Sequence, residues 1–171
     1  MRQRLVHSFL FSIVLLIIAC NLGKKSNKGS GTSTTTSTSS SMQLRNRITD
    51  YAQKYVGSNY QYAGTSPSTG FDCSGFTSYV MKEFKIKISP ASSAQAKEGR
   101  SIALDRVQPG DLIFFGEGKS RISHVGMVVK RSKAGIVCVH STTSRGVIVE
   151  NVSTSTYWKP KILFARDVVS K

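Results

Sequence analysis

The hydrophobic pattern changes character along the chain, and this change restricts the fold more than any other feature of the sequence. In the first part, apolar residues recur at the three- to four-residue spacing of helices. This spacing predicts one helix from Leu44 to Val56, which Gly57 would end, and a second that begins at Cys73. A short third helix is expected over residues 92–97.

The second part of the chain contains short segments of β-branched and aromatic residues, separated by Gly, Ser and Lys. Such segments are typical of strands. The predicted strands are Leu112–Phe115, Val125–Val129, Ile136–Val139, Val147–Val149 and Ile162–Phe164. Helices followed by strands on short connections predict an α+β domain, with its N-terminal helices packed on a central antiparallel sheet.

Residues 1–19 are predicted to be a signal peptide rather than part of the fold. Arg2 and Arg4 give the chain a positive start, and the apolar run over residues 9–19 is interrupted only by Ser12. This run is too short to span a bilayer, which needs about 20 apolar residues. It does fit the apolar region of a secretory signal.

The end of this segment predicts a lipid anchor. Residues 17–20, with the sequence IIAC, resemble a bacterial lipobox, in which a small residue precedes the cysteine that becomes the lipidated start of the mature protein. Cys20 is therefore the predicted lipid attachment site, and an ordinary signal peptide with an incidental Cys20 is the alternative. Ser, Thr, Gly and Lys dominate residues 20–41, which are expected to form a disordered tether to a domain over 42–171.

The chain is strongly basic. Its formal net charge is +15, from 24 Lys and Arg against 9 Asp and Glu, and no acidic residue precedes Asp50. Such a charge favours polyanionic surroundings, which include nucleic acid, anionic lipid and a cell wall rich in carboxylates. Because the signal peptide predicts export, intracellular nucleic acid is not expected as a partner.

Cys73 is the candidate nucleophile. A thiol at the start of a helix faces unpaired N–H groups and the positive end of the helix dipole, which favour the thiolate. Asp72 can cap the same helix. A nucleophile also needs a base and a group that orients the base. His124 begins one predicted strand and His140 ends the next, so adjacent strands would let His124 act as base while His140 fixes its tautomer.

Other interpretations of these residues stay open at this point. Export to an oxidising compartment allows a disulfide between Cys73 and Cys138. His140 at a strand edge is also compatible with a solvated surface residue. A zinc site built from Cys73, His124 and His140 is a further alternative, although the paired spacings typical of zinc ligands are absent from the sequence.

Several fragments resemble the signature of the NlpC family of papain-like cell-wall cysteine peptidases. Tyr60–Gly64 precedes Gly70–Phe76, the segment that contains the candidate nucleophile. Downstream, Gln108–Phe115, His124–Gly126 and His140 with the following serine occur in the order of the family. The resemblance covers essentially the whole predicted domain, and it implies the papain-like fold.

The resemblance also implies roles for individual residues. Cys73 would be the nucleophile, His124 the base and His140 the orienting third member of the triad. The implied shell for the oxyanion and the substrate contains Tyr60, Asp72, Ser74 and Ser92. Because the preceding stretch is one residue shorter than the family pattern, Ser93 is the alternative to Ser92. No metal or organic cofactor is implied.

The implied activity is hydrolysis of amide bonds in peptidoglycan stem peptides, at γ-D-glutamyl-diaminopimelate or at the D-alanyl-diaminopimelate cross-link. A catalytically silent peptidoglycan-binding lipoprotein is one alternative, and a thiol amidase or acyltransferase on the same fold is another. The expected partners are stem peptides, a membrane reached through Cys20 and an unidentified regulator. The expected location is the cell envelope, at an outer membrane and facing the periplasm.

Overall fold

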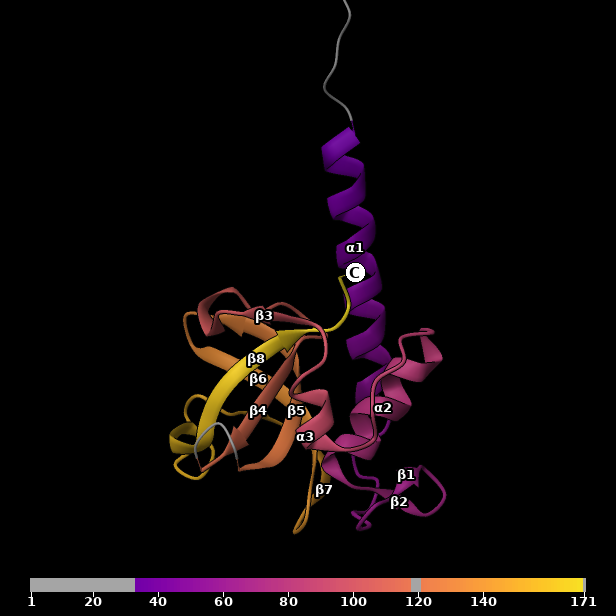
Figure 1. Ribbon diagram of the computed structural model, residues 1–171, viewed down its shortest axis with the longest axis vertical. Helices are drawn as coiled ribbons and strands as arrows, with labels where there is room; N and C mark the ends of the chain where they lie inside the picture. The colour runs from indigo at the N-terminus through magenta and orange to yellow at the C-terminus, as the bar shows by residue number, and fades with distance from the viewer. Residues whose placement is uncertain (1–32, 118–120, 171) are drawn as a thin grey trace, which may run out of the picture. The chain divides into compact units, whose positions relative to one another are not determined.

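Helices come first and strands later in the fold, as the sequence predicts. The computed structural model describes residues 33–117 and 121–170, and of residues 33–37 only the backbone. Three helices lie on one side of a six-stranded antiparallel sheet (Figure 1). The α+β class and the antiparallel sheet are therefore confirmed. The helices are α1 (Ser33–Gln53), α2 (Cys73–Glu83) and α3 (Ser92–Gln95).

The order of the strands in the sheet is β3-β8-β4-β5-β6-β7. These strands are β3 (Arg100–Ile102), β4 (Leu112–Gly116), β5 (Ile122–Ser132), β6 (Gly135–Thr142), β7 (Gly146–Asn151) and β8 (Ile162–Asp167). The small hairpin β1 (Thr65–Ser66) and β2 (Gly70–Phe71) precedes α2, and short 3-10 turns cover Leu104–Arg106 and Lys159–Lys161. All five predicted strands are present, and β3 and the hairpin are additional.

Helix α1 begins at Ser33, inside the segment predicted as a tether. Its residues 38–43 are exposed, and Arg45 is the first buried residue along the part whose side chains are described. No Gly or Pro occurs within the helix, so the local sequence does not stop it from extending beyond the turns that pack on the domain. The predicted signal peptide, Cys20 and the first part of the predicted tether lie outside the described residues.

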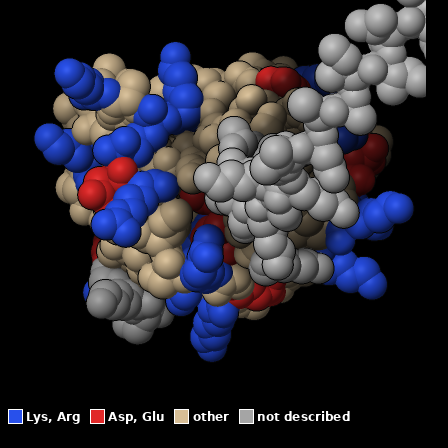
Figure 2. Space-filling view, turned by 90° about the horizontal axis from the view of Figure 1, so that it is seen from above, with Lys and Arg blue, Asp and Glu red and all other residues tan. Residues whose placement is uncertain are grey.

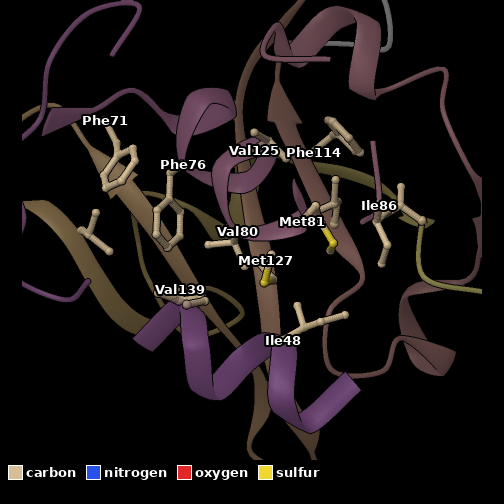
Figure 3. Packing of buried hydrophobic residues seen from close by; sticks show 14 of the residues in the cluster. Ile48, Phe71, Phe76, Val80, Met81, Ile86, Phe114, Val125, Met127 and Val139 are labelled. Atoms are coloured by element: carbon tan, nitrogen blue, oxygen red, sulfur yellow. The ribbon is translucent and has the colours of Figure 1, made fainter. Parts of the chain in front are cut away.

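The two faces of the sheet bury different sets of side chains, because successive residues of a strand point to opposite sides. In β4, Leu112 and Phe114 face the helices, whereas Ile113 and Phe115 face away from them. The helix-facing core (Figure 3) includes Ile48, Phe71, Phe76, Val80, Met81, Val125, Met127 and Val139. The opposite face is covered in part by Trp158, which packs with Phe115 and Cys138.

Arg45 fastens α1 to the end of the chain through a buried ionic network. Its Nη1 donates to Asp111 Oδ1 at 2.7 Å and to the carbonyl oxygen of Pro109 at 2.9 Å. Its Nη2 donates to Asp167 Oδ1 at 2.7 Å and to Ser170 Oγ at 2.9 Å. One guanidinium group thereby joins the first helix, the start of β4 and the end of β8.

The surface of the domain is mainly basic. Figure 2 shows Lys and Arg side chains around one face of the molecule, with fewer Asp and Glu side chains among them. Within residues 33–117 and 121–170, no helix combines the length and the apolar character needed to cross a membrane.

Candidate active site

Cys73 is the first residue of α2, as predicted. Asp72 caps the helix: its Oδ1 accepts hydrogen bonds from the Gly75 N–H at 2.6 Å and from Ser74 Oγ at 3.1 Å. A Cβ atom at Gly75 would overlap the carbonyl oxygen of Gly64, so only glycine allows the preceding loop to pack this tightly on the first turn. The cap and the loop together fix the position of Cys73.

A second link joins the start of α2 to the sheet. Ser141 Oγ donates a hydrogen bond of 2.7 Å to the carbonyl oxygen of Phe71, and both groups are fully buried. Phe71 lies just before the helix cap, and Ser141 follows His140 in β6. This hydrogen bond therefore links the start of α2, which carries Cys73, to the strand that carries His140.

His124 and His140 meet on neighbouring strands. His124 Nε2 lies 2.9 Å from His140 Nδ1, and both imidazoles are buried. Gly126 in β5 leaves room for the His140 side chain, because a Cβ atom at Gly126 would lie only 3.3 Å from His140 Cβ. The pairing of β5 with β6 supplies the adjacency of the two histidines that the sequence left as an assumption.

Glu150 and Trp158 complete this cluster, and the sequence analysis assigned a role to neither. His140 Nε2 lies 3.0 Å from Glu150 Oε1, and the same oxygen accepts from Trp158 Nε1 at 2.9 Å and from Arg145 Nη2 at 2.7 Å. The Trp158 ring stacks on His124 with 4.4 Å between ring centroids. The register of the β6–β7 hairpin would have indicated that Glu150 lies near His140. His140 pairs with Ile148, and Glu150, two residues further along β7, lies on the same face of the sheet.

A cavity of about 350 Å³ opens beside these residues. Cys73, His124 and Tyr60 all line it, so the structure brings the predicted nucleophile, base and oxyanion-binding residue together. Its other lining residues are mostly hydroxyl-bearing or basic: Ser123, Ser141, Thr142, Thr143, Ser144, Arg145, Ser155, Tyr157, Trp158 and Lys161.

The other predicted recognition residues lie outside this lining. Asp72 and Ser74 belong to the helix cap, with Ser74 buried. Ser92 begins α3 and is half-buried, and Ser93 beside it is exposed and lines a separate groove. The contacts of Asp72 and Ser74 in the structure are those of a helix cap, and a role of Ser92 or Ser93 toward substrate remains a prediction.

Burial controls the protonation of the site. Burial raises the pKa of the Cys73 thiol, and the Val125 and Ser74 hydrogen-bond donors oppose this shift only in part. Burial also lowers the pKa of His124 well below its usual value and that of His140 to about 4, where Glu150 acts in the opposite direction. These shifts favour the neutral thiol and the neutral imidazoles, whereas the helix position of Cys73 favours the thiolate.

The cysteines and histidines form neither a bridge nor a metal site in the described structure. Cys73 and Cys138 are both free thiols, and Cys138 is fully buried on the face of the sheet that points away from the helices. Within residues 33–117 and 121–170, no group of three or more His, Cys, Asp or Glu side chains has an arrangement that could hold a metal ion.

A comparison with known protein families matches residues 57–167 to the model of the NlpC/P60 family. The chain belongs to this family. The match begins before Tyr60 and includes Cys73, both histidines and Glu150, and family members related to this chain include cell-wall endopeptidases. The resemblance inferred from the sequence fragments is confirmed.

The names of two relatives describe hydrolytic reactions. The chain is 31% identical over 126 residues to "Gamma-DL-glutamyl hydrolase" of Bacillus subtilis, a match that covers 72% of this chain and 30% of that protein. It is 30% identical over 131 residues to "Murein DD-endopeptidase MepS/Murein LD-carboxypeptidase" of Escherichia coli, covering 76% of this chain and 66% of that protein. The match thus spans less than a third of the first relative.

Solved structures of NlpC/P60 proteins have the same fold as this chain. An NlpC/P60 family protein from Bacillus cereus matches with a TM-score of 0.67 and 29% identity, over 74% of this chain and 40% of that one. RipD from Mycobacterium tuberculosis matches with a TM-score of 0.58 and 19% identity, over 72% of this chain and 95% of that one, and is described as a non-catalytic NlpC/p60 domain protein. The fold alone therefore does not establish catalysis, and the side chains of the site must carry that argument.

Proposed function

We propose that this protein is a cysteine endopeptidase that hydrolyses amide bonds of peptidoglycan stem peptides. The observation that carries the proposal is the hydrogen bond between His124 and His140 at the wall of the cavity that Cys73 also lines. A nucleophile, a base and a group that orients the base are the minimum set for thiol catalysis. A protein that only binds the cell wall needs none of them.

The reaction begins with attack of Cys73 Sγ on the scissile carbonyl carbon, while the thiol proton passes to His124. Because burial raises the pKa of the thiol and so favours its neutral form, this transfer accompanies the attack. As the C–S bond forms, negative charge develops on the carbonyl oxygen. The Cys73 N–H and the Tyr60 hydroxyl are suited to stabilise this charge, since both are hydrogen-bond donors and Tyr60 lines the same cavity as Cys73.

The second half of the reaction returns the enzyme to its resting state. His124 gives its proton to the leaving amine as the C–N bond breaks, which leaves a thioester on Cys73. Water then attacks the thioester carbonyl and passes a proton to His124. The C–S bond breaks, the acid product leaves, and His124 returns the proton to Cys73. His140 keeps the His124 ring in place through both steps.

The composition of the cavity supports an anionic peptide as substrate. Arg145 and Lys161 line it together with the hydroxyl groups of Ser and Thr residues. Stem peptides carry carboxylates, which basic side chains and hydroxyl donors can bind. One relative is named a gamma-DL-glutamyl hydrolase and the other a murein DD-endopeptidase, so a γ-glutamyl bond and the peptide cross-link are both candidates for this chain.

The proposed location is the cell envelope. The lipobox-like sequence before Cys20 supports an exported lipoprotein, and the basic charge of +15 suits both an anionic membrane surface and a wall rich in carboxylates. We place the protein at an outer membrane, facing the periplasm, with its domain able to reach the wall and an unidentified regulator limiting its action.

A digest of purified muropeptides, analysed by mass spectrometry, tests the activity. The full chain should produce new peptide termini, and the fragment masses identify the bond. Cys73→Ala should produce none, whereas Cys138→Ala should cut like the parent chain, because Cys138 is a fully buried thiol that does not line the cavity. Equal cutting by Cys73→Ala would remove Cys73 as nucleophile.

The two alternatives predict different products. If neither the parent chain nor its variants cut any muropeptide but all bind peptidoglycan, the silent binding protein is the correct interpretation. If the parent chain releases whole stem peptides from the glycan, or transfers acyl groups, the thiol amidase or acyltransferase is correct instead.

A further inference from the structure

Glu150 lies behind the two histidines, outside the triad carried by Cys73, His124 and His140. Its Oε1 is 3.0 Å from His140 Nε2, and its side chain is one-fifth exposed whereas that of His140 is fully buried. Strand β7 supplies this carboxylate, so the chain Glu150–His140–His124 crosses three neighbouring strands, β7, β6 and β5. The cavity lies at the far end of this chain of contacts.

The direction of each hydrogen bond follows from the carboxylate. An ionised carboxylate only accepts, so His140 Nε2 must carry a hydrogen. A neutral imidazole has one donor and one acceptor, so His140 Nδ1 is then an acceptor. The 2.9 Å contact with His124 Nε2 therefore requires a hydrogen on that nitrogen. The remaining nitrogen, His124 Nδ1, is left with a free lone pair.

We propose that Glu150 is a positioning residue that sets the tautomers of both histidines, so that His124 keeps Nδ1 free to take the proton of Cys73. The inference rests on the proposed function in so far as a base at His124 is needed. Without the carboxylate, His140 can also carry its hydrogen on Nδ1. That hydrogen would turn His124 Nε2 into the acceptor and place a proton on His124 Nδ1, which removes the base.

Glu150 is itself held in place from two sides. Trp158 Nε1 and Arg145 Nη2 both donate to Oε1, the same oxygen that accepts from His140. The charged and titratable groups that face His140 are therefore Glu150 from β7, Arg145 from the turn between β6 and β7, and His124 from β5. Glu150 stabilises a protonated His140, and Arg145 opposes it.

Nitrogen NMR of the imidazoles tests the tautomers without any turnover. The full chain labelled with ¹⁵N-histidine has three histidines, and the signal of His7 is assigned by its loss in His7→Gln. We expect His124 and His140 both to carry hydrogen on Nε2 at about pH 7. Glu150→Leu offers His140 no acceptor, so a mixture of tautomers is expected, whereas in Glu150→Gln the Trp158 and Arg145 donors would hold the amide oxygen in the place of Oε1.

Kinetics on muropeptides provide the second readout. Glu150→Leu should lower kcat about tenfold, the low end of the effect of a hydrogen bond to a charged group, while KM stays within about twofold. Loss of the carboxylate destabilises protonated histidine, so the acid limb of the pH profile should move to lower pH. Glu83→Leu, the same change on the exposed side of α2, should alter none of these quantities.

Each contrary result has a distinct meaning. Hydrogen on Nδ1 of His140 in the parent chain, or identical tautomers in the parent and in Glu150→Leu, would overturn the positioning role. An unchanged kcat and an unchanged acid limb in a well-folded Glu150→Leu would do the same, because a purely structural Glu150 would leave both unmoved. Failure of the parent chain to cut muropeptides would refute the proposed function, and the NMR result would still decide the tautomers.

Discussion

Replacing Arg45 by Met should destabilise the domain more than any exposed substitution on α1. The Met side chain keeps most of the apolar stem but removes the guanidinium group. Asp111 is fully buried, and within residues 33–117 and 121–170 its carboxylate retains one hydrogen bond, from the Gln108 N–H to Oδ2 at 2.8 Å. Asp167 loses one cation but keeps Arg100 and two backbone N–H donors, those of Val169 and Ser170.

The size of the effect follows from these remaining partners. Removing one partner of a buried ion pair costs about 3–5 kcal/mol, because the other charge stays buried. We expect the free energy of unfolding of Arg45→Met to fall by about 3 kcal/mol, the low end of this range. Asp167 keeps its other hydrogen bonds, so the penalty falls on Asp111. This is a large part of the stability of a domain, which is about 5–15 kcal/mol.

Urea denaturation of the full chain at pH 7 and pH 5 measures this loss. Burial raises the pKa of Asp111, while the Gln108 N–H and Arg45 lower it, so removal of Arg45 raises it further. A carboxyl with a raised pKa in the folded state stabilises the fold as the pH falls, because the folded form takes up the proton more readily. The difference in the free energy of unfolding between the parent chain and Arg45→Met should therefore be smaller at pH 5 than at pH 7.

Two further variants sharpen the test. Arg47→Met, an exposed change on the same helix, should cost no more than about 1 kcal/mol, the scale of its exposed contact with Phe84. Adding Asp111→Asn to Arg45→Met should recover part of the loss, since a buried neutral amide costs less than a buried charge. A loss below about 1 kcal/mol for Arg45→Met, or a gap that widens at pH 5, would refute the reasoning.

Two other predictions concern the site and the anchor. Gly126→Ala should push His140 by a few tenths of an ångström and lower kcat about tenfold or more. Lys130→Ala, on the exposed part of β5, should leave kcat unchanged. An unchanged kcat in Gly126→Ala would show that the His124–His140 contact tolerates the shift. Growth with labelled palmitate should mark the parent protein and leave Cys20→Ser unmarked, and equal labelling of both would remove the lipid anchor from the proposal.

The helices and strands could be predicted because their apolar residues repeat at clear periods. Phe76 and Val80 on α2, and the alternating residues of β4, bury the faces that their spacing indicates. Strand β3 was missed because it is short, and Arg100 and Ser101 in it are exposed, so it carries no such period. The start of α1 was missed because residues 33–41 are all Ser or Thr and leave no apolar period in the sequence.

The site was predictable only in part. Cys73, His124 and His140 stand out because their chemistry and neighbours are distinctive, but the contact between the histidines depends on strand pairing. Glu150 was missed because an acidic residue in a strand gives no sign of its partner until the hairpin register is known. The protonation of Cys73 could not be predicted from its helix position, because the effect of burial depends on the whole surrounding fold.

The hydrogen bond from Ser141 to Phe71 joins two layers that each hold part of the proposed catalytic site, with Cys73 on a helix and His124 and His140 on the sheet. Before folding, the chain therefore carries a thiol with no imidazole beside it. If the predicted signal peptide directs export of the unfolded chain, the proposed endopeptidase is inactive toward the wall during export. The proposed hydrolysis can start only after the helix and the sheet have packed together, so folding itself controls when the activity appears.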